Sequence, residues 1–203
     1  MSGQALLLYV VAAIGLSVTP GPNSLLAITH GALYGHRRTL FTVSGGAMGF
    51  AALIGLSMLG LGAVLQASAQ ALAVLKFAGG AYLVWLGVQV WRAPPVRFDG
   101  VQGGARVTGA GLFHQGLLTA VSNPKALLFF GAFLPQFIDP ARNLLTQAVV
   151  MMVVFVVIEY AFEVFLAVMA SRITPWLERA GRRFNRVCGG MFVVMGIALP
   201  VSR

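Results

Sequence analysis

Long apolar runs are the feature that most restricts the fold of this chain. The segment at 149–171, VVMMVVFVVIEYAFEVFLAVMAS, contains two acidic side chains and is long enough to cross a bilayer, which takes about 20 residues of helix. Over the whole chain 58% of the residues are hydrophobic and 9% are charged, which is too little polar surface for a soluble domain of this size. The sequence therefore predicts an all-α integral membrane protein.

The apolar runs predict six transmembrane helices, at 5–29, 42–65, 72–91, 109–134, 145–171 and 184–202. Ten arginines lie in the first, third and fifth linkers, whereas Arg142 and Arg203 lie on the other side. The positive-inside rule then places the three basic linkers in the cytoplasm and both termini outside. Because this rule accounts for the net charge of +9, we expect no nucleic-acid partner.

The two halves of the chain resemble each other weakly, which predicts a repeat. TPGPNSLL at 19–26 matches SNPKALLF at 122–129, and KFAGGAYLV at 76–84 matches RVCGGMFVV at 186–194. We therefore expect a first three-helix repeat at 1–91, a cytoplasmic linker at 92–108 and a second three-helix repeat at 109–203. Since three is an odd number of crossings, the two repeats must be inverted relative to each other, as in many secondary transporters.

Transmembrane segments one and four are each interrupted by a polar, proline-containing stretch. Proline has no backbone N–H and pushes the preceding residue away from helical dihedral angles. An unpaired backbone group in hydrocarbon costs several kcal/mol, so the breaks must face protein or a watery cavity. The predicted substrate-binding residues are those of the two breaks: Thr19, Pro20, Gly21, Pro22, Asn23, Ser122, Asn123, Pro124 and Lys125.

Each break also starts a new half-helix, which suits the binding of an anion. Asn23 and Asn123 are good N-cap residues, and Pro124 suits the first helical position. Free N–H groups and the positive end of the helix dipole favour a carboxylate, and Lys125 adds a full positive charge. The alternative is that the prolines only kink the helices and shape their packing.

Glu159 and Glu163 lie near the middle of the fifth span, four residues apart and hence on one helix face. An acid at the membrane centre costs about 2.5–3.5 kcal/mol on insertion scales. Two carboxylates this close resist ionising together, so we expect at least one to hold a proton. They are predicted to bind a proton or a substrate ammonium group; the alternative is a structural pairing with Lys125 or Lys76.

Other residues carry weaker signals. Gly45, Gly46 and Gly49 predict close helix packing, with a homodimer through this face as the alternative. The single cysteine, Cys188, excludes an internal disulfide, and the three histidines are too far apart in the sequence to predict a metal site. Without a catalytic or nucleotide-binding motif, we expect neither an enzyme nor a bound cofactor.

Three stretches resemble the LysE/RhtB family of amino-acid exporters: TPGPN in the first span, NPKA followed by FFGAFLPQFID in the fourth, and KFAGGAYLVWLG in the third. The resemblance covers essentially the whole chain. It implies export of amino acids such as lysine, arginine, homoserine, threonine or leucine across the bacterial inner membrane, with coupling to protons. Pro20–Asn23 match the first family motif and Asn123–Lys125 the second.

The function we expect is therefore a secondary transporter that exports amino acids by proton antiport. Neutral substrates are favoured over lysine and arginine, because no acidic pocket beyond Glu159 and Glu163 is evident for a second cation. One alternative is a cation or heavy-metal exporter, since related branches of the family move cadmium or other ions. The other is a membrane enzyme or a structural membrane subunit that transports nothing.

Overall fold

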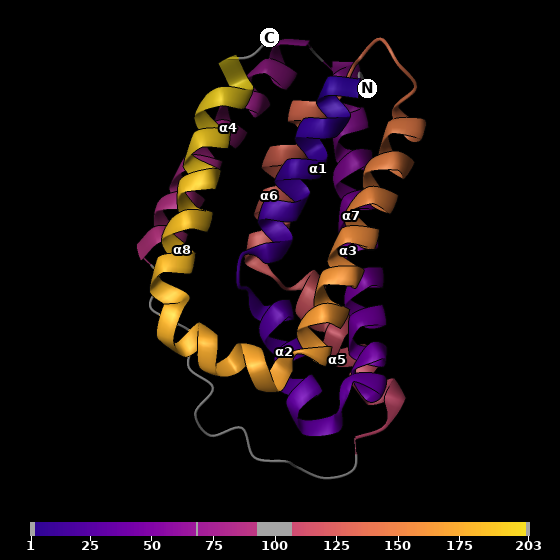
Figure 1. Ribbon diagram of the computed structural model, residues 1–203. Coiled ribbons are helices and arrows are strands. Elements are labelled where there is room, and N and C mark those ends of the chain that lie inside the picture. Colours follow the sequence, from indigo (N-terminus) through magenta and orange to yellow (C-terminus); the bar gives the residue numbers. More distant parts are fainter. Residues whose placement is uncertain (1–2, 68, 93–106, 202–203) are drawn as a thin grey trace.

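The computed structural model describes residues 3–67, 69–92 and 107–201, and these residues form a helical bundle (Figure 1). The elements in chain order are α1 (Gly3–Val18), α2 (Pro22–Tyr34), α3 (His36–Ala67), α4 (Ala69–Arg92), α5 (Gly109–Val121), α6 (Pro124–Phe133), the 3-10 helix η1 (Leu134–Phe137), α7 (Leu144–Val168) and α8 (Ala170–Val201). The described residues contain no strand, so the all-α fold is confirmed. Most of the predicted linker at 92–108 lies outside the described residues.

The two predicted breaks are present. Helices α1 and α2 meet at an angle of 54°, and α5 meets the segment Lys125–Phe137 at 52°. Each bent pair covers one predicted span, 5–29 or 109–134. The change of direction falls on the proline-containing stretch in both cases, as expected from the missing N–H groups and the restricted dihedral angles before proline.

The described helices include segments suited to a membrane. Two single helices, α3 over His36–Leu61 and α7, are long and apolar enough to cross a bilayer, and each bent pair also meets this requirement as one span. The N-terminal end of α1 and the C-terminal end of α8 lie at the same end of the molecule (Figure 1). The arrangement as six spans in two inverted repeats stays a prediction.

The end of the fifth predicted span differs from expectation, because the linker after it is helical. Helix α8 begins at Ala170 and continues to Val201, whereas the sequence analysis placed a loop before 184. The exposed arginines at 172, 183 and 186 fall on one helical face, so this stretch forms an amphipathic helix. Figure 1 shows α8 crossing one end of the bundle before it turns along α4.

Aromatic side chains form the centre of the bundle around α6. Phe129 and Phe133 are fully buried and their ring centroids lie 4.1 Å apart. Tyr9 of α1 is also fully buried, and its hydroxyl donates a hydrogen bond of 2.9 Å to the carbonyl oxygen of Met151 in α7. Close van der Waals packing of this kind, with paired polar groups, stabilises helices in a membrane, and here Tyr9 joins α1 to α7 while its ring packs on Phe133 of α6.

Glycines allow several pairs of helices to pack backbone to backbone, and α3 with α5 is one of them. In α3, a Cβ atom on Gly45 would collide with the Phe113 carbonyl group of α5, and one on Gly49 would lie 2.7 Å from Ala120 Cβ. The predicted close packing at these glycines is therefore confirmed within the chain. A homodimer remains a prediction, and these two glycines face α5 of the same chain.

Helices α4 and α8 form another such pair. A Cβ atom on Gly87 would lie 2.6 Å from the Gly189 carbonyl oxygen, and one on Gly196 would lie 2.6 Å from that of Gly80. Gly80 and Gly189 belong to the two GG stretches that the sequence comparison matched. Each of these two glycines therefore packs against a glycine of the partner helix, Gly80 against Gly196 and Gly189 against Gly87, and the two GG pairs lie at different levels of the contact.

A buried polar site between two broken helices

The first break runs from the end of α1 at Val18 to the start of α2 at Pro22. Gly21 occupies the N-cap position and makes no side-chain hydrogen bond there. The predicted N-cap role of Asn23 is therefore wrong, because the helix starts at Pro22, whose fixed φ suits the first helical position. Asn23 instead lies in the first turn of α2, where it is buried.

The second break agrees with the prediction. Asn123 is the N-cap of α6, and its Oδ1 accepts a hydrogen bond of 3.0 Å from the Lys125 backbone N–H. Pro124 takes the first helical position; its side chain lies outside the described set. Ser122 is exposed at the end of α5, and its hydroxyl donates to the Leu118 carbonyl oxygen at 2.6 Å, so it lies at the edge of the site.

The two breaks meet inside the bundle. Asn123 Nδ2 donates a hydrogen bond of 3.3 Å to Asn23 Oδ1 across 100 residues of sequence. Both asparagines are buried. The starts of α2 and α6, which carry free backbone N–H groups and the positive ends of two helix dipoles, therefore lie close together.

Lys125 reaches from the first turn of α6 to the end of α1. Its ammonium group donates hydrogen bonds to the carbonyl oxygens of Leu16 at 3.1 Å and Thr19 at 2.8 Å. The last carbonyl groups of a helix have no helical partner and form the negative end of its dipole, which explains this attraction. The sequence predicted a lysine beside an anion site, whereas the structure shows its ammonium already bound to α1.

Glu159 and Glu163 project from one face of α7 into the same region. Their exposed fractions are 5% and 2%, and among the described residues Glu159 Oε2 and Glu163 Oε1 accept no hydrogen bond. In the described part of the chain, neither acid forms an ion pair within 4.0 Å. Buried polar atoms without partners mark a place where a ligand or proton fits.

A small cavity of about 10 Å³ lies at the meeting point of these groups. Its volume is close to the minimum for one water molecule, whereas ligand pockets usually measure about 300–1,000 Å³. The site is therefore closed in this conformation. The cavity is lined by Leu16, Gly21, Asn23, Ser24, Phe50, Asn123, Lys125, Ala126, Phe155 and Glu159.

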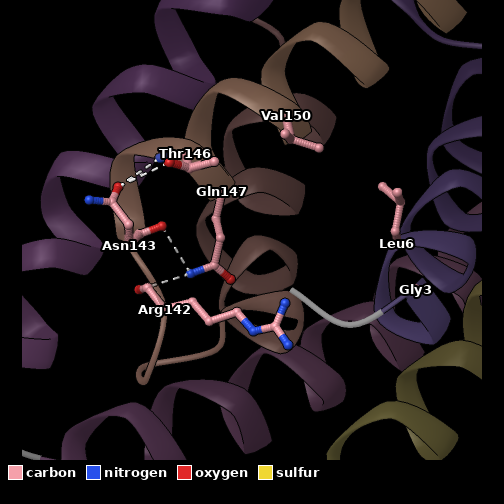
Figure 2. A pocket seen from close by; sticks show the side chains of 7 residues that line it. All are labelled: Gly3, Leu6, Arg142, Asn143, Thr146, Gln147 and Val150. Carbon is pink, nitrogen blue, oxygen red and sulfur yellow. Dashed lines mark hydrogen bonds between the residues drawn. The ribbon is translucent and has the colours of Figure 1, made fainter.

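A larger pocket of about 340 Å³ lies between the first turns of α1 and α7 (Figure 2). Its polar side chains bond within their own segment: Arg142 pairs with Asp139 at 3.1 Å, and Gln147 Nε2 donates to the Asp139 carbonyl oxygen at 3.0 Å. None of the predicted binding residues lines it. The larger pocket has the volume of a ligand site, but the buried acids and both helix breaks lie around the smaller cavity. The smaller cavity is therefore the better candidate for the substrate site.

Comparison with known proteins adds the family to this geometry. The model of the LysE type translocator family matches residues 14–203. The chain belongs to this family. Its members are transporters, and the match indicates no catalytic family.

Several curated relatives match this translocator over nearly its whole length. An uncharacterized membrane protein of Vibrio cholerae is 32% identical over 97% of both chains. A homoserine/homoserine lactone efflux protein of Salmonella typhimurium is 30% identical over 96% of this chain and 95% of its own. A leucine efflux protein of an Enterobacter species is 27% identical over 91% and 90%, respectively. No solved structure matches.

The translocator's cavity contains residues that the sequence analysis missed. Phe50 of α3 and Phe155 of α7 line it, but in so apolar a chain no sequence signal separates them from other core aromatics. Gly46 was assigned only to packing; a Cβ atom there would lie 3.1 Å from Asn23 Nδ2 and 3.4 Å from Glu163 Oε2. The missing side chain of Gly46 therefore leaves room on α3 for Asn23 of α2 and Glu163 of α7 to approach the same place.

The described residues of the translocator contain no group of three or more histidine, cysteine, aspartate or glutamate side chains that could hold a metal ion. Cys188 is buried and free. The polar side chains at the site are thus two amides, the Ser24 hydroxyl, one lysine and two carboxyl groups.

Proposed function

We propose that this translocator is a secondary exporter of neutral amino acids, driven by proton antiport across the bacterial inner membrane. The observation that carries the proposal is the hydrogen bond between Asn23 and Asn123. It joins two helix starts at the protein centre, next to two buried acids that each have one oxygen atom without a hydrogen-bond partner among the described residues. The efflux names of the Salmonella and Enterobacter relatives support an amino-acid cargo.

The substrate carboxylate binds at the starts of α2 and α6. Both helices exceed eight residues, so each contributes a partial positive charge and free N–H groups at its first turn. The side-chain amides of Asn23 and Asn123 supply further donors. Thr19, Pro20, Gly21 and Pro22 shape the first wall of this site, and Ser122, Pro124 and Lys125 the second.

The two acids bind the two positive charges of the transport cycle, the substrate ammonium group and the coupled proton. Glu159 lines the cavity and faces the substrate ammonium group. Glu163 lies one helical turn away, and two carboxylates this close resist ionising together, so one of them carries the coupled proton. A proton and a substrate ammonium then compete for the same negative charge, which is the physical basis of antiport.

A neutral side chain fits the rest of the cavity wall. Leu16, Phe50 and Phe155 are apolar lining residues, and Glu159 and Glu163 are already assigned to the ammonium group and the proton. A lysine or arginine substrate would bring a second cation without a carboxylate to meet it. Homoserine, threonine and leucine carry no second cation, so they fit this set of charged groups.

The conformational change follows from the proposed inverted repeats. Helices of predicted spans two and four pack together, as α3 with α5, and so do spans one and five, as α2 with α7. A two-fold axis in the membrane plane relates these pairs in an inverted repeat. Rocking of one half against the other opens the closed site to the cytoplasm and then to the outside, where both termini lie.

Proton coupling is tested by uptake of labelled L-leucine and L-homoserine into liposomes that contain the purified protein. A pH gradient is expected to drive accumulation by the wild type, whereas Glu163→Gln keeps only equilibration of the label across the membrane. Asp139→Asn is the matched control, because Asp139 is a loop acid paired with Arg142, and it should accumulate substrate normally. Gradient-driven accumulation by both Glu163→Gln and Glu159→Gln would show that these acids do not carry the proton.

A further inference from the structure

We propose that the end of α1 is the binding site of the substrate ammonium group, and that the Lys125 ammonium occupies this site when the transporter is empty. The inference rests on the proposed function and assigns a role that the sequence did not predict. Leu16 and Thr19 supply the site through backbone carbonyl oxygens, so their side-chain identity does not reveal it.

The first argument is the chemistry of the contact. Lys125 Nζ lies 3.1 Å from Leu16 O and 2.8 Å from Thr19 O. A lysine ammonium and the ammonium of an amino acid carry the same charge and the same number of N–H donors. Carbonyl oxygens at the negative end of a helix dipole attract either group. The position of Nζ therefore marks where a substrate nitrogen fits.

The second argument is the surroundings of this position. Lys125 and Glu159 line the same cavity, and Glu159 Oε2 is buried without a hydrogen-bond partner among the described residues. Among the described residues, the ionisable groups near the lysine ammonium include Glu159 and Glu163 of α7 and Cys188 of α8. A cation at the end of α1 thus meets two carbonyl oxygens and an acid that has spare acceptor capacity.

The third argument is the closed state itself. The cavity has a volume of about 10 Å³, too small for an amino acid, since even a single water needs about that much. Without a cation, two buried carbonyl groups would be left without their partner, which is costly in a membrane interior. Lys125 pairs with them and so stabilises an empty, closed conformation. A substrate ammonium replaces it, which frees Lys125 to join the carboxylate.

The two transport modes separate this role from a structural one. In exchange, the carrier returns loaded, so the substrate ammonium fills the site in both directions. In net efflux the carrier returns without substrate, with a proton on one of the two acids, and needs Lys125 to fill the carbonyl site at the end of α1. Lys125→Met also loses a partner of the substrate carboxylate, so leucine exchange should fall, but net efflux should fall about tenfold or more beyond the loss of exchange. Lys125→Arg keeps the charge and should retain more net efflux than Lys125→Met.

The experiment uses liposomes with labelled L-leucine, assayed with and without unlabelled L-leucine on the opposite side. External methylammonium is expected to restore net efflux of Lys125→Ala, because this small cation can enter the vacated site and return in place of the lysine. Equal losses of exchange and efflux in Lys125→Met, or normal net efflux in that variant, would overturn the proposal.

A measurement on the wild type covers the case in which these variants fail to fold. The hydroxy analogue of leucine, 2-hydroxy-4-methylpentanoate, lacks the ammonium group and should not exchange with internal leucine. Exchange as fast as that of leucine would refute the ammonium site. A wild-type protein that moves neither leucine nor homoserine would instead refute the proposed function, and this inference with it.

Discussion

Gly21, in the first break, is required for space and not for backbone freedom. Its φ of −150° and ψ of 177° are extended values that any residue adopts. A Cβ atom at this position would lie 2.9 Å from Lys125 Nζ and 3.1 Å from Lys125 Cε. The absence of a side chain therefore makes room for the ammonium group at the end of α1.

Gly21→Ala tests this steric role. The added methyl group should displace the lysine ammonium from the carbonyl oxygens of Leu16 and Thr19, and we expect net efflux of leucine to fall about three- to tenfold. Initial efflux rates from liposomes measure the effect. Gly131→Ala in α6 is the matched control, because nothing lies within 4 Å of its added Cβ atom. A wild-type rate for Gly21→Ala would contradict the assigned contact.

At the scale of elements, α6 and α7 both start with an asparagine N-cap whose side-chain oxygen accepts a backbone N–H. Asn123 Oδ1 accepts from Lys125 N at 3.0 Å, and Asn143 Oδ1 accepts from Thr146 N at 3.0 Å. Asn123 is buried at the meeting point of the breaks, whereas Asn143 is exposed. The two caps therefore form a natural pair for separating stability from transport.

Asn123→Ala and Asn143→Ala should each destabilise the protein, because loss of an N-cap costs about 0.5–2 kcal/mol. Asn123→Ala should in addition reduce transport strongly, since it removes the partner of Asn23, while Asn143→Ala transports normally. Apparent melting temperatures in detergent and leucine efflux rates give the two readouts. Equal efflux by the two variants would argue against a substrate role for the second break.

The breaks could be predicted from the sequence because proline acts on its immediate neighbours. The same holds for Asn123, whose cap bond spans two residues. The contact of Lys125 with α1 could not be predicted, because its acceptors lie 106 and 109 residues away and are backbone atoms. The acids Glu159 and Glu163 were identified by their charge in an apolar run, but their spare oxygen atoms depend on packing by other helices.

At the scale of the whole molecule, the arginine distribution predicts the orientation. Replacement of Cys188 by alanine leaves a chain without cysteine, into which single cysteines can be placed at the exposed positions Ala141 and His36. A membrane-impermeant maleimide should label Ala141→Cys in intact cells and His36→Cys only after permeabilisation. The reverse labelling pattern would invert the predicted topology and the direction of every proposed step.

The contact between α4 and α8 has a consequence for motion. The Gly87 and Gly189 backbones approach so closely that neither position has room for a Cβ atom, and interiors packed this tightly switch between discrete arrangements and do not deform continuously. The two helices therefore resist sliding past each other. When the central site opens, α4 and α8 move together as one rigid unit. The amphipathic start of α8 belongs to the same helix. A displacement of that segment at the membrane surface would therefore be transmitted along α8 to Cys188, which lies near Lys125.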